Sequence, residues 1–241
     1  DYVARGTVPT HVRSKLYDAL TARGYQVRLD DLAVLCAPDA PATASAKPMV
    51  LLIIGGGIAA YKALETARQM QRLGLDVTGV MTKSAAQFIT PLSVAALTNQ
   101  KCYDDLFSLT DEAEMGHIRL ARSADLVLVM PATANLMARA AAGLADDLAT
   151  TILLATTAPV LMAPAMNPAM WTHPATSANL TILQQRGVHM IGPTEGDTAC
   201  GEIGSGRMSE PADIVAAAYQ LAVKRPRLLA GKTAIVTAGP T

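Results

Sequence analysis

The sequence predicts an α/β fold: a doubly wound parallel sheet of the Rossmann-like type, with helices on both faces in three α/β/α layers. From residue 49 onward, short apolar runs alternate with longer segments of helical periodicity, which is the order expected of βαβ units. The first apolar run, Val50–Ile54, contains no polar residue, as is typical of a strand buried on both faces of a parallel sheet. The chain is 51% hydrophobic but 4% aromatic, a composition that suits closely packed α/β layers.

Length and charge narrow the class of protein. With 241 residues, the chain is long enough for one domain of about 180–190 residues and additional segments. Lys and Arg number 20, as do Asp and Glu, so charge gives no reason to expect nucleic acid or an acidic membrane as the main partner. No apolar run approaches the roughly 18–20 residues that cross a bilayer. The three cysteines are far apart and form no C-x-x-C pair, so we expect a reduced, cytoplasmic setting without disulfides or structural zinc.

We expect three parts along the chain: an N-terminal extension and linker over 1–48, a main domain over 49–223, and a linker with the first strand of a truncated domain over 224–241. In the extension, His11–Arg23 has helical spacing and Tyr25–Leu29 suits a short strand, and neither carries recognisable chemistry. Near the other end, Thr233–Thr237 predicts a fresh strand that starts a further domain.

The first strand runs into a turn made of Gly55, Gly56 and Gly57. After it, apolar residues fall three apart, which predicts a helix with one apolar side: Ile58, Tyr61, Leu64, Ala67 and Met70. Glycines let backbone N–H groups approach a phosphate closely, and a helix N-terminus adds partial positive charge. The segment therefore predicts an anion site, although a tight turn that binds nothing is consistent with the same residues.

The second strand, predicted over Val77–Met81, bears on which phosphate is bound. The residues Gly55–Ala60 fit the degenerate dinucleotide pattern G-x-G-x-x-A, but a nicotinamide site usually has an acidic residue at the end of the second strand. Here that strand is followed by Thr82, Lys83 and Ser84. The sequence therefore favours a mononucleotide, with the hydroxyls of Thr82 and Ser84 as donors.

The remaining elements continue the alternation. Helices are predicted over Pro91–Leu97, His117–Arg122, Leu136–Ala142, Asp147–Ala155, Pro174–Arg186 and Pro211–Val223, and strands over Lys101–Tyr103, Leu126–Met130, Val160–Ala163 and Val188–Ile191. Loops are predicted over Pro131–Asn135, Pro164–Trp171 and the glycine-rich Gly192–Met208. Because ligands collect at the C-terminal ends of parallel strands, we expect the glycine turn, Thr82–Ser84, and the first two of these loops to converge on one site.

Five side chains are candidates for chemistry. An imidazole titrates near pH ~6.5, so His117 suits a general base, although a structural histidine is the commoner role. The amide of Asn167 can donate to a carboxylate or cap the helix that follows. Cys200 begins a glycine-rich segment that suits a flap, and its thiol suits an acid or nucleophile unless the loop is merely a surface loop. Met166 and Met170 either line a pocket or fill core. No Cys or carboxylate stands at metal-ligand spacing from a histidine, so we expect no metal.

Six segments occur in a recognisable order: Gly56–Lys62, Phe88–Ser93, Gly116–Ile118, Pro131–Asn135, Pro164–Asn167 and Ala199–Met208. Together they resemble the phosphopantothenoylcysteine decarboxylases, a family of homo-oligomeric flavin-containing cysteine decarboxylases that in bacteria form half of a bifunctional coenzyme A biosynthesis protein. The resemblance covers residues 49–223. The segment Thr233–Thr241 resembles the opening of the ligase half, and Ala199–Met208 separates this family from other flavoproteins.

The resemblance implies FMN as the cofactor, in a homo-oligomer built from trimers, up to a dodecamer, with flavin sites at subunit contacts. It assigns the phosphate and ribityl chain to Gly56, Gly57, Ile58, Ala59, Thr82 and Ser84, and the rest of the cofactor to Phe88, Ala132, Thr133, Ala134 and Asn135. It makes His117 the base, Asn167 the contact to the substrate carboxylate, and Cys200 the proton donor. It assigns the binding of phosphopantothenoylcysteine to Met166, Asn167, Met170, Ala199, Arg207 and Met208.

The reaction implied is the FMN-dependent decarboxylation of 4'-phosphopantothenoylcysteine to 4'-phosphopantetheine in coenzyme A biosynthesis, through a thioaldehyde and an enethiolate. Ligase activity is expected only where a C-terminal ligase domain is present. Three alternatives stay open: a flavin-dependent peptidyl-cysteine decarboxylase, a flavin prenyltransferase, and a non-catalytic flavin-binding regulatory subunit. The chain departs from the family pattern at Gly55, where Ser or Thr is common, and in its N-terminal extension.

Overall fold

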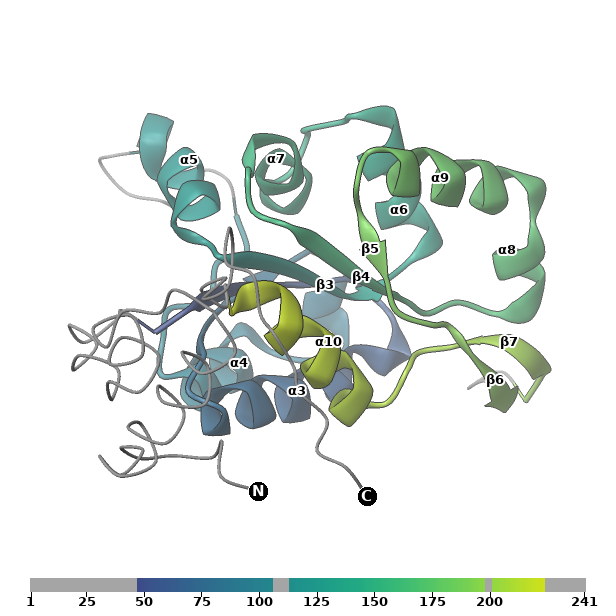
Figure 1. The fold of residues 1–241 in the computed structure, drawn as a ribbon, viewed down its shortest axis with the longest axis horizontal. Helices are drawn as coiled ribbons and strands as arrows, with labels where there is room; N and C mark the ends of the chain where they lie inside the picture. The colour runs from purple at the N-terminus through teal and green to yellow at the C-terminus, as the bar shows by residue number, and fades with distance from the viewer. Residues whose placement is uncertain (1–46, 106–112, 198–200, 224–241) are drawn as a thin grey trace, which may run out of the picture. The chain divides into compact units, whose positions relative to one another are not determined.

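Five parallel strands form the central sheet in the order β2-β1-β3-β4-β5 (Figure 1). The computed structural model describes residues 47–105, 113–197 and 201–223. The strands are β1 (Met49–Ile54), β2 (Asp76–Met81), β3 (Leu126–Ala132), β4 (Val160–Pro164) and β5 (His189–Met190). The parallel sheet predicted from the alternating pattern is therefore confirmed.

The central strands are apolar throughout because both faces of the sheet are covered by helices. In β1, Val50, Leu52 and Ile54 belong to one buried cluster, whereas Leu51 and Ile53 belong to a second cluster on the other face. Successive side chains of a strand point to opposite faces, so an unbroken apolar run is what two buried faces require.

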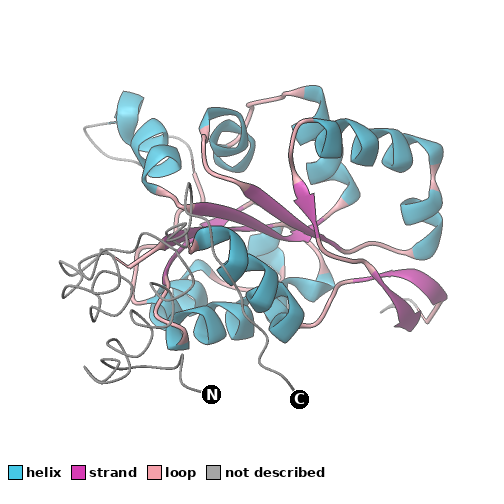
Figure 2. Cartoon of the chain, in the orientation of Figure 1, coloured by secondary structure: helices cyan, strands magenta, loops and turns pink. Residues whose placement is uncertain are grey.

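The helices divide between the two faces (Figures 1 and 2). Figure 1 shows α3, α4 and α10 below the sheet and α5, α6, α7 and α9 above it. The first group is α3 (Tyr61–Arg72), α4 (Pro91–Thr98) and α10 (Pro211–Ala222). The second is α5 (Ala113–Ser123), α6 (Ala134–Ala142), α7 (Leu148–Ala155) and α9 (Pro174–Gln185). Three shorter helices are η1 (Ile58–Ala60), η2 (Ala85–Gln87) and α8 (Pro168–Thr172).

Polar side chains fix several helix starts. Thr90 caps α4 and Thr133 caps α6, each accepting a hydrogen bond from a backbone N–H three residues on. Asp147 and Thr150 form a capping box at the start of α7. Gly143, at a φ of 71°, ends α6 in the left-handed region that glycine favours. These signals explain why the predicted bounds of these helices agree closely with the structure.

Four predictions about local structure need correction. The glycine-rich stretch predicted as a loop contains an antiparallel hairpin, β6 (Thr194–Asp197) and β7 (Ile203–Arg207). Most of the residues predicted as a loop over Pro131–Asn135 belong to regular elements, because β3 continues to Ala132 and α6 starts at Ala134. The predicted strand at Lys101–Tyr103 shrinks to a single bridge between Tyr103 and Val80. The apolar stripe predicted after the glycine turn is buried only from Ala67 onward, since Ile58 and Tyr61 are each 60% exposed.

Several predictions fall on residues outside the described ranges. They are the helix and strand of the N-terminal extension, the strand at Thr233–Thr237, and the positions Ala199 and Cys200. The division at residue 48 stays a prediction, because residues 1–46 lie outside the described ranges.

Candidate functional site

A cavity of about 890 Å³ lies at the C-terminal edge of the sheet. Its lining comes from segments that follow β1, β2, β3 and β4, together with the end of the hairpin: residues 56–59, 61, 62, 84, 133–135, 165–167, 170 and 206–208. In the order β2-β1-β3-β4-β5, the chain leaves β1 and β3 toward opposite faces, and ligands of open α/β sheets bind in the crevice this creates. The expected convergence of loops is thus observed, in a cavity within the ~300–1,000 Å³ range of small-molecule sites.

The glycine turn is packed too closely to accept side chains. A Cβ on Gly56 would lie 2.2 Å from the Cβ of Ser84, and one on Gly55 would lie 2.2 Å from the carbonyl oxygen of Pro131. Gly57, in contrast, is extended at a φ of −171°, and a Cβ there would meet its nearest heavy atom at 3.8 Å. Gly56 therefore brings the turn after β1 against the turn after β2, and Gly55 brings it against β3. The hydroxyl expected from the common Ser or Thr at position 55 has no room in this backbone.

The turn leads directly into helix, which gives the cavity an anion-binding character. Ile58–Ala60 form η1 and α3 begins at the next residue, so the first helical N–H groups belong to residues that line the cavity. Lys62 and Arg207 also line it, and its described lining residues include no Asp or Glu. Backbone donors and two cations at one wall suit a ligand with negatively charged groups.

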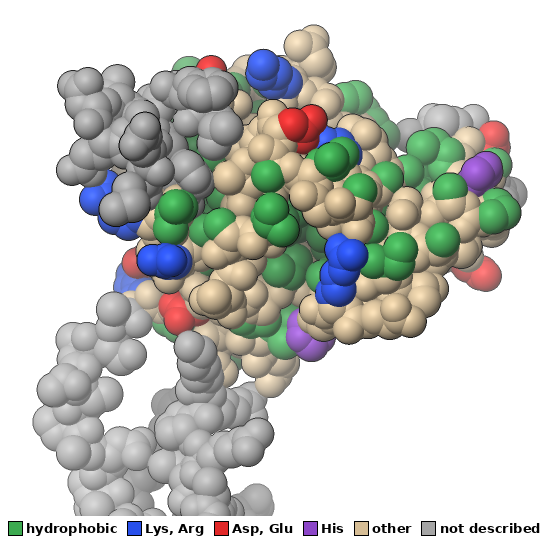
Figure 3. Space-filling view, turned by 90° about the horizontal axis from the view of Figure 1, so that it is seen from above, with side chains coloured by type: hydrophobic (Ala, Val, Ile, Leu, Met, Phe, Trp, Pro, Cys, Tyr) green, Lys and Arg blue, Asp and Glu red, His purple; other side chains and the backbone are tan. Residues whose placement is uncertain are grey.

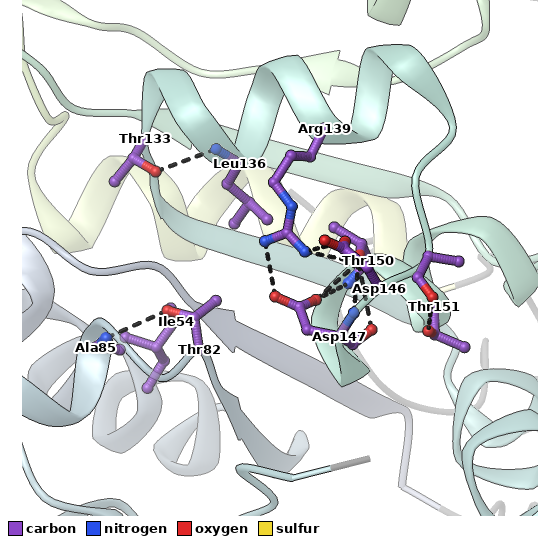
Figure 4. Close-up of polar contacts among 11 residues, drawn as sticks. Ile54, Thr82, Ala85, Thr133, Leu136, Arg139, Asp146, Asp147, Thr150 and Thr151 are labelled. Carbon is purple, nitrogen blue, oxygen red and sulfur yellow. Dashed lines mark hydrogen bonds and ion pairs between the residues drawn. The ribbon is translucent and has the colours of Figure 1, made fainter.

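The two hydroxyls predicted as donors differ in their surroundings. Ser84 lines the cavity. The Thr82 hydroxyl is buried; it donates to the Ile54 carbonyl at 3.2 Å and accepts from the Ala85 N–H at 3.2 Å (Figure 4). Thr82 therefore shapes the turn after β2, and Ser84 is the one of the pair that faces the main cavity.

The segment after β3 contributes through its capping residue and first helical turn. Thr133 accepts from the Leu136 N–H at 3.3 Å (Figure 4), and Ala134 and Asn135 line the cavity beside it. Ala132 does not: it is fully buried in β3 and packs in the core. Phe88, also predicted as a cofactor contact, is 48% exposed and is not part of the cavity lining.

Asn167 holds its place by capping α8. Its Oδ1 accepts a hydrogen bond from the Met170 N–H at 2.8 Å, and the residue lines the cavity together with Met166 and Met170. Capping uses the amide oxygen, whereas donation to a carboxylate would use the amide NH₂ group. The two roles weighed for Asn167 from the sequence are therefore compatible in this geometry.

Strand β7 fixes the hairpin to the segment that carries Met166 and Asn167. The Met166 N–H donates to the Gly206 carbonyl at 3.0 Å, and a Cβ on Gly206 would lie 2.3 Å from the Met166 carbonyl oxygen. Met208, which follows the hairpin, is buried in the core. The hairpin base thus packs against the cavity wall, while Ala199 and Cys200 lie outside the described residues.

His117 belongs to α5, which is not near α8 within one chain. α5 packs against α7, whereas α8 packs against α9 and β7. Figure 1 shows α5 and α8 at opposite sides of the view. The structure describes the backbone of His117 as helical. The single chain therefore brings Asn167 to the cavity and leaves the helix of His117 away from it.

A second cavity, of about 470 Å³, shares Gly56, Ser84, Thr133 and Asn135 with the first. On its far wall the Arg139 side chain reaches from α6 to Asp147 at 2.8 Å and also bonds Asp146 (Figure 4). Burial raises the pKa of Asp147, but the Thr150 N–H and the Arg139 guanidinium outweigh it and hold that pKa below its usual value. This ion-pair group joins α6 to the start of α7 and lines the second cavity on the side away from the first.

The described residues outside the two cavities show few of the features of charged, metal-binding and membrane-spanning proteins. On the face drawn in Figure 3, basic and acidic side chains are dispersed among apolar and neutral ones. Among the described residues there is no cluster of His, Cys, Asp and Glu that suits a metal ion. No helix in the described ranges is long and apolar enough to cross a membrane.

Sequence reasoning missed four lining residues. Tyr61, Lys62, Ala165 and Gly206 line the cavity, although no role was predicted for them. All four lie inside the recognised motifs, and a lysine one turn into a helix after a glycine turn is itself a signal of an anion site. Tyr61 was assigned to an apolar helix face, and its 60% exposure shows why that pattern misled.

A family model and curated relatives match most of the chain. The Flavoprotein family model matches residues 39–222. The coenzyme A biosynthesis bifunctional protein CoaBC of Vibrio vulnificus strain YJ016 is 48% identical over 192 residues, which is 80% of this chain and 47% of that protein. The chain thus spans about half the length of the curated relatives it matches.

Several solved structures resemble the fold, among them the following two. A PPC decarboxylase variant complexed with pantothenoylaminoethenethiol has a TM-score of 0.61 at 34% identity, over 71% of this chain and 96% of the other. The FMN binding protein AtHal3 has a TM-score of 0.63 at 35% identity, over 71% of this chain and 94% of the other.

Proposed function

We propose that this chain, which belongs to the flavoprotein family, is an FMN-dependent decarboxylase of phosphopantothenoylcysteine. One observation carries the proposal: the cavity at the C-terminal edge of the sheet joins the glycine turn, two cations and the Asn167 amide. The relatives supply the chemistry, since the chain is 48% identical to a CoaBC protein and 34% identical to a PPC decarboxylase. The active unit is the domain over 49–223, and we assign the enzyme to the cytoplasm.

The cavity fits FMN at its phosphate end. The near contact between Gly56 and Ser84 leaves backbone and one hydroxyl, rather than side-chain bulk, at the start of α3. Gly56, Gly57, Ile58 and Ala59 would hold the phosphate through their N–H groups, with Ser84 as a hydroxyl donor. Thr133, Ala134 and Asn135 would contact the remainder of the cofactor, whereas Thr82 and Ala132 support this wall from within the core.

The residues of the chain then orient the carboxylate of phosphopantothenoylcysteine and transfer protons to and from this substrate. Simple loss of CO₂ from a cysteinyl carboxylate would leave an unstabilised carbanion. Bound FMN would avoid it by accepting a hydride before CO₂ leaves and donating it back afterwards, so that the overall reaction is redox-neutral. Asn167 donates its amide N–H to the substrate carboxylate, His117 accepts the thiol proton, and Cys200 gives the proton that completes the product. Met166, Met170 and Met208 form the apolar wall that excludes water from the reacting carbon.

The active site requires a second copy of the chain. Asn167 lines the cavity, but α5 with His117 packs against α7 away from α8. Ile58 and Tyr61 sit at the cavity with 60% of their surface exposed, as apolar residues do where another subunit packs. A homo-oligomer built from trimers would bring the His117 of one subunit to the cavity of its neighbour.

Turnover of defined substrates tests the proposal. The purified chain, loaded with FMN, should convert phosphopantothenoylcysteine to phosphopantetheine with release of CO₂. A peptide ending in cysteine, and a prenyl donor supplied with reduced flavin, test the alternative decarboxylase and prenyltransferase. A flavin-loaded protein that binds phosphopantothenoylcysteine but does not turn it over would contradict the proposal and favour a regulatory subunit.

A further inference from the structure

Glu210 begins α10 but does not cap it. It occupies the N-cap position, and its side chain makes no capping hydrogen bond to the helix. Ser, Thr, Asp and Asn are the residues preferred at an N-cap, because their short side chains reach back to the first N–H groups. The Glu210 carboxylate is directed instead toward two cations that line the main cavity.

The first cation is Lys62, from the helix that follows the glycine turn. Its Nζ donates to both Glu210 oxygens at 3.1 Å and to the Met208 carbonyl at 3.4 Å. The lysine side chain is only 12% exposed. An ammonium enclosed to this degree, and bonded to a carboxylate and a backbone carbonyl, is held in place at the cavity wall.

The second cation is Arg207, the last residue of β7. Its guanidinium bonds Glu210 Oε1, the oxygen that also accepts from Lys62. The side chain lies along β6, since a Cβ on Gly196 would meet the Arg207 Nη1 at 3.3 Å. One carboxylate therefore joins the helix after the glycine turn to the end of the hairpin.

The Lys62–Glu210–Arg207 cluster carries two positive charges and one negative charge. Hydrogen bonding from Lys62, with further attraction from Arg207, holds the pKa of Glu210 below its usual value, so the carboxylate is ionised at neutral pH. The surplus positive charge faces a cavity whose described lining residues include no carboxylate. A bound anion would neutralise the surplus positive charge of the cluster.

We propose that Glu210 is a positioning residue, which holds Lys62 and Arg207 together at the cavity wall so that the pair binds an anionic group of the substrate. This inference rests on the proposed function, because the substrate named there carries two such groups, a carboxylate and a phosphate. Glu210 itself does not line the cavity and does not touch the reacting atoms. It acts by fixing the two cations and by holding the hairpin end against α3.

A double-mutant cycle tests this coupling. Glu210→Ala is expected to raise the KM for phosphopantothenoylcysteine about tenfold and to leave flavin content unchanged. In a Lys62→Met background, which lowers activity by itself, Glu210→Ala should raise KM clearly less than about tenfold, because only its effect through Arg207 remains. Glu210→Gln, which keeps the hydrogen-bond acceptor, should recover part of the loss. Asp213→Asn is the matched control, since it removes an exposed carboxylate from the same helix turn.

Two substrates identify the group that the cations bind. If they contact the phosphate, Glu210→Ala will affect phosphopantothenoylcysteine and spare pantothenoylcysteine; if they contact the carboxylate, it will affect both. The affinity for phosphopantetheine, which carries the phosphate but no carboxylate, is measured by titration without turnover and tests the contact to the phosphate separately. An unchanged KM for both substrates, or equal effects of Glu210→Ala with and without Lys62, would overturn the inference. An inactive unaltered enzyme would instead contradict the proposed function, and the phosphopantetheine titration would still test the contact to the phosphate.

Discussion

At the scale of single residues, Gly56 shows how a missing side chain builds a binding site. Two turns from different strands meet at this position, where a Cβ would lie 2.2 Å from that of Ser84. We expect Gly56→Ala to push the turn after β2 away and weaken FMN binding about tenfold or more, since overpacking of this kind costs about 1–3 kcal/mol. Flavin titration of the apoprotein measures the affinity, and circular dichroism checks that the fold persists.

Gly57→Ala is the comparison for this prediction. The added methyl group on residue 57 would lie 3.8 Å from its nearest heavy atom, which is an ordinary van der Waals distance. The Gly57→Ala variant should therefore lose less flavin affinity than Gly56→Ala. Equal losses from the two variants would contradict the close-packing explanation.

Asp147 links a single charge to the dependence of stability on pH. Its folded-state pKa lies below the ordinary value because the Thr150 N–H and Arg139 outweigh the effect of burial. The sign follows from linkage: a lowered carboxyl pKa stabilises the fold above the unfolded value of about 3.9, and the contribution is lost as pH falls through the folded pKa. We expect Asp147→Asn, which keeps a capping oxygen, to cost about 1 kcal/mol at pH 7.

The measurement is the melting temperature of both proteins across pH. The gap between the unaltered protein and Asp147→Asn should be widest at neutral pH and should close below a pH of about 4. A gap that stayed constant into acid would show that the ionised form of Asp147 contributes nothing.

Some residue roles were readable from the sequence and others were not. The Asn167 cap could be predicted, because Asn before Pro and a short helix is a local signal. The ion pair of Lys62 could not, because its partner Glu210 lies 148 residues away in the sequence. The sequence position of Thr82 shows a hydroxyl but not the Ile54 carbonyl to which it donates. Thr82 lines the second cavity, and its role as a ligand donor stays a prediction.

At the scale of elements, periodicity predicted those parts that pack against the sheet. The residues of β1 and β3 are apolar because helices cover both faces, so the pattern and the structure have the same cause. The hairpin was missed because backbone hydrogen bonds, rather than a buried apolar face, pair its two strands. Gly196, Gly204 and Gly206 leave its strands without an alternation of apolar and polar side chains, and its pairing depends on the backbone.

The hairpin gives the prediction at this scale. Gly206→Ala would place a Cβ 2.3 Å from the Met166 carbonyl oxygen and should displace β7 from the segment that carries Asn167. We expect kcat/KM to fall about tenfold while FMN stays bound, because the phosphate end of the cofactor lies at the glycine turn. Glu195→Gln, on an exposed position of β6, is the control and should retain full activity. Loss of flavin together with activity would show that the hairpin supports the cofactor instead.

At the scale of the whole molecule, the separation of α5 from α8 leads to a test by mixing two inactive variants. His117→Asn removes the base, and Asn167→Asp keeps a capping oxygen but sets a negative charge against the substrate carboxylate; each should lower kcat at least 100-fold, on the order of a lost acid–base group. If each site takes His117 from one subunit and Asn167 from its neighbour, random mixed oligomers hold both unaltered residues in about a quarter of their sites. Co-expressed variants should then regain about that share of activity, whereas each variant carried through the same procedure separately should stay inactive. Mixed oligomers, verified by mass, that remained inactive would place both residues in one chain, and α5 would have to move to the cavity by a change within the subunit.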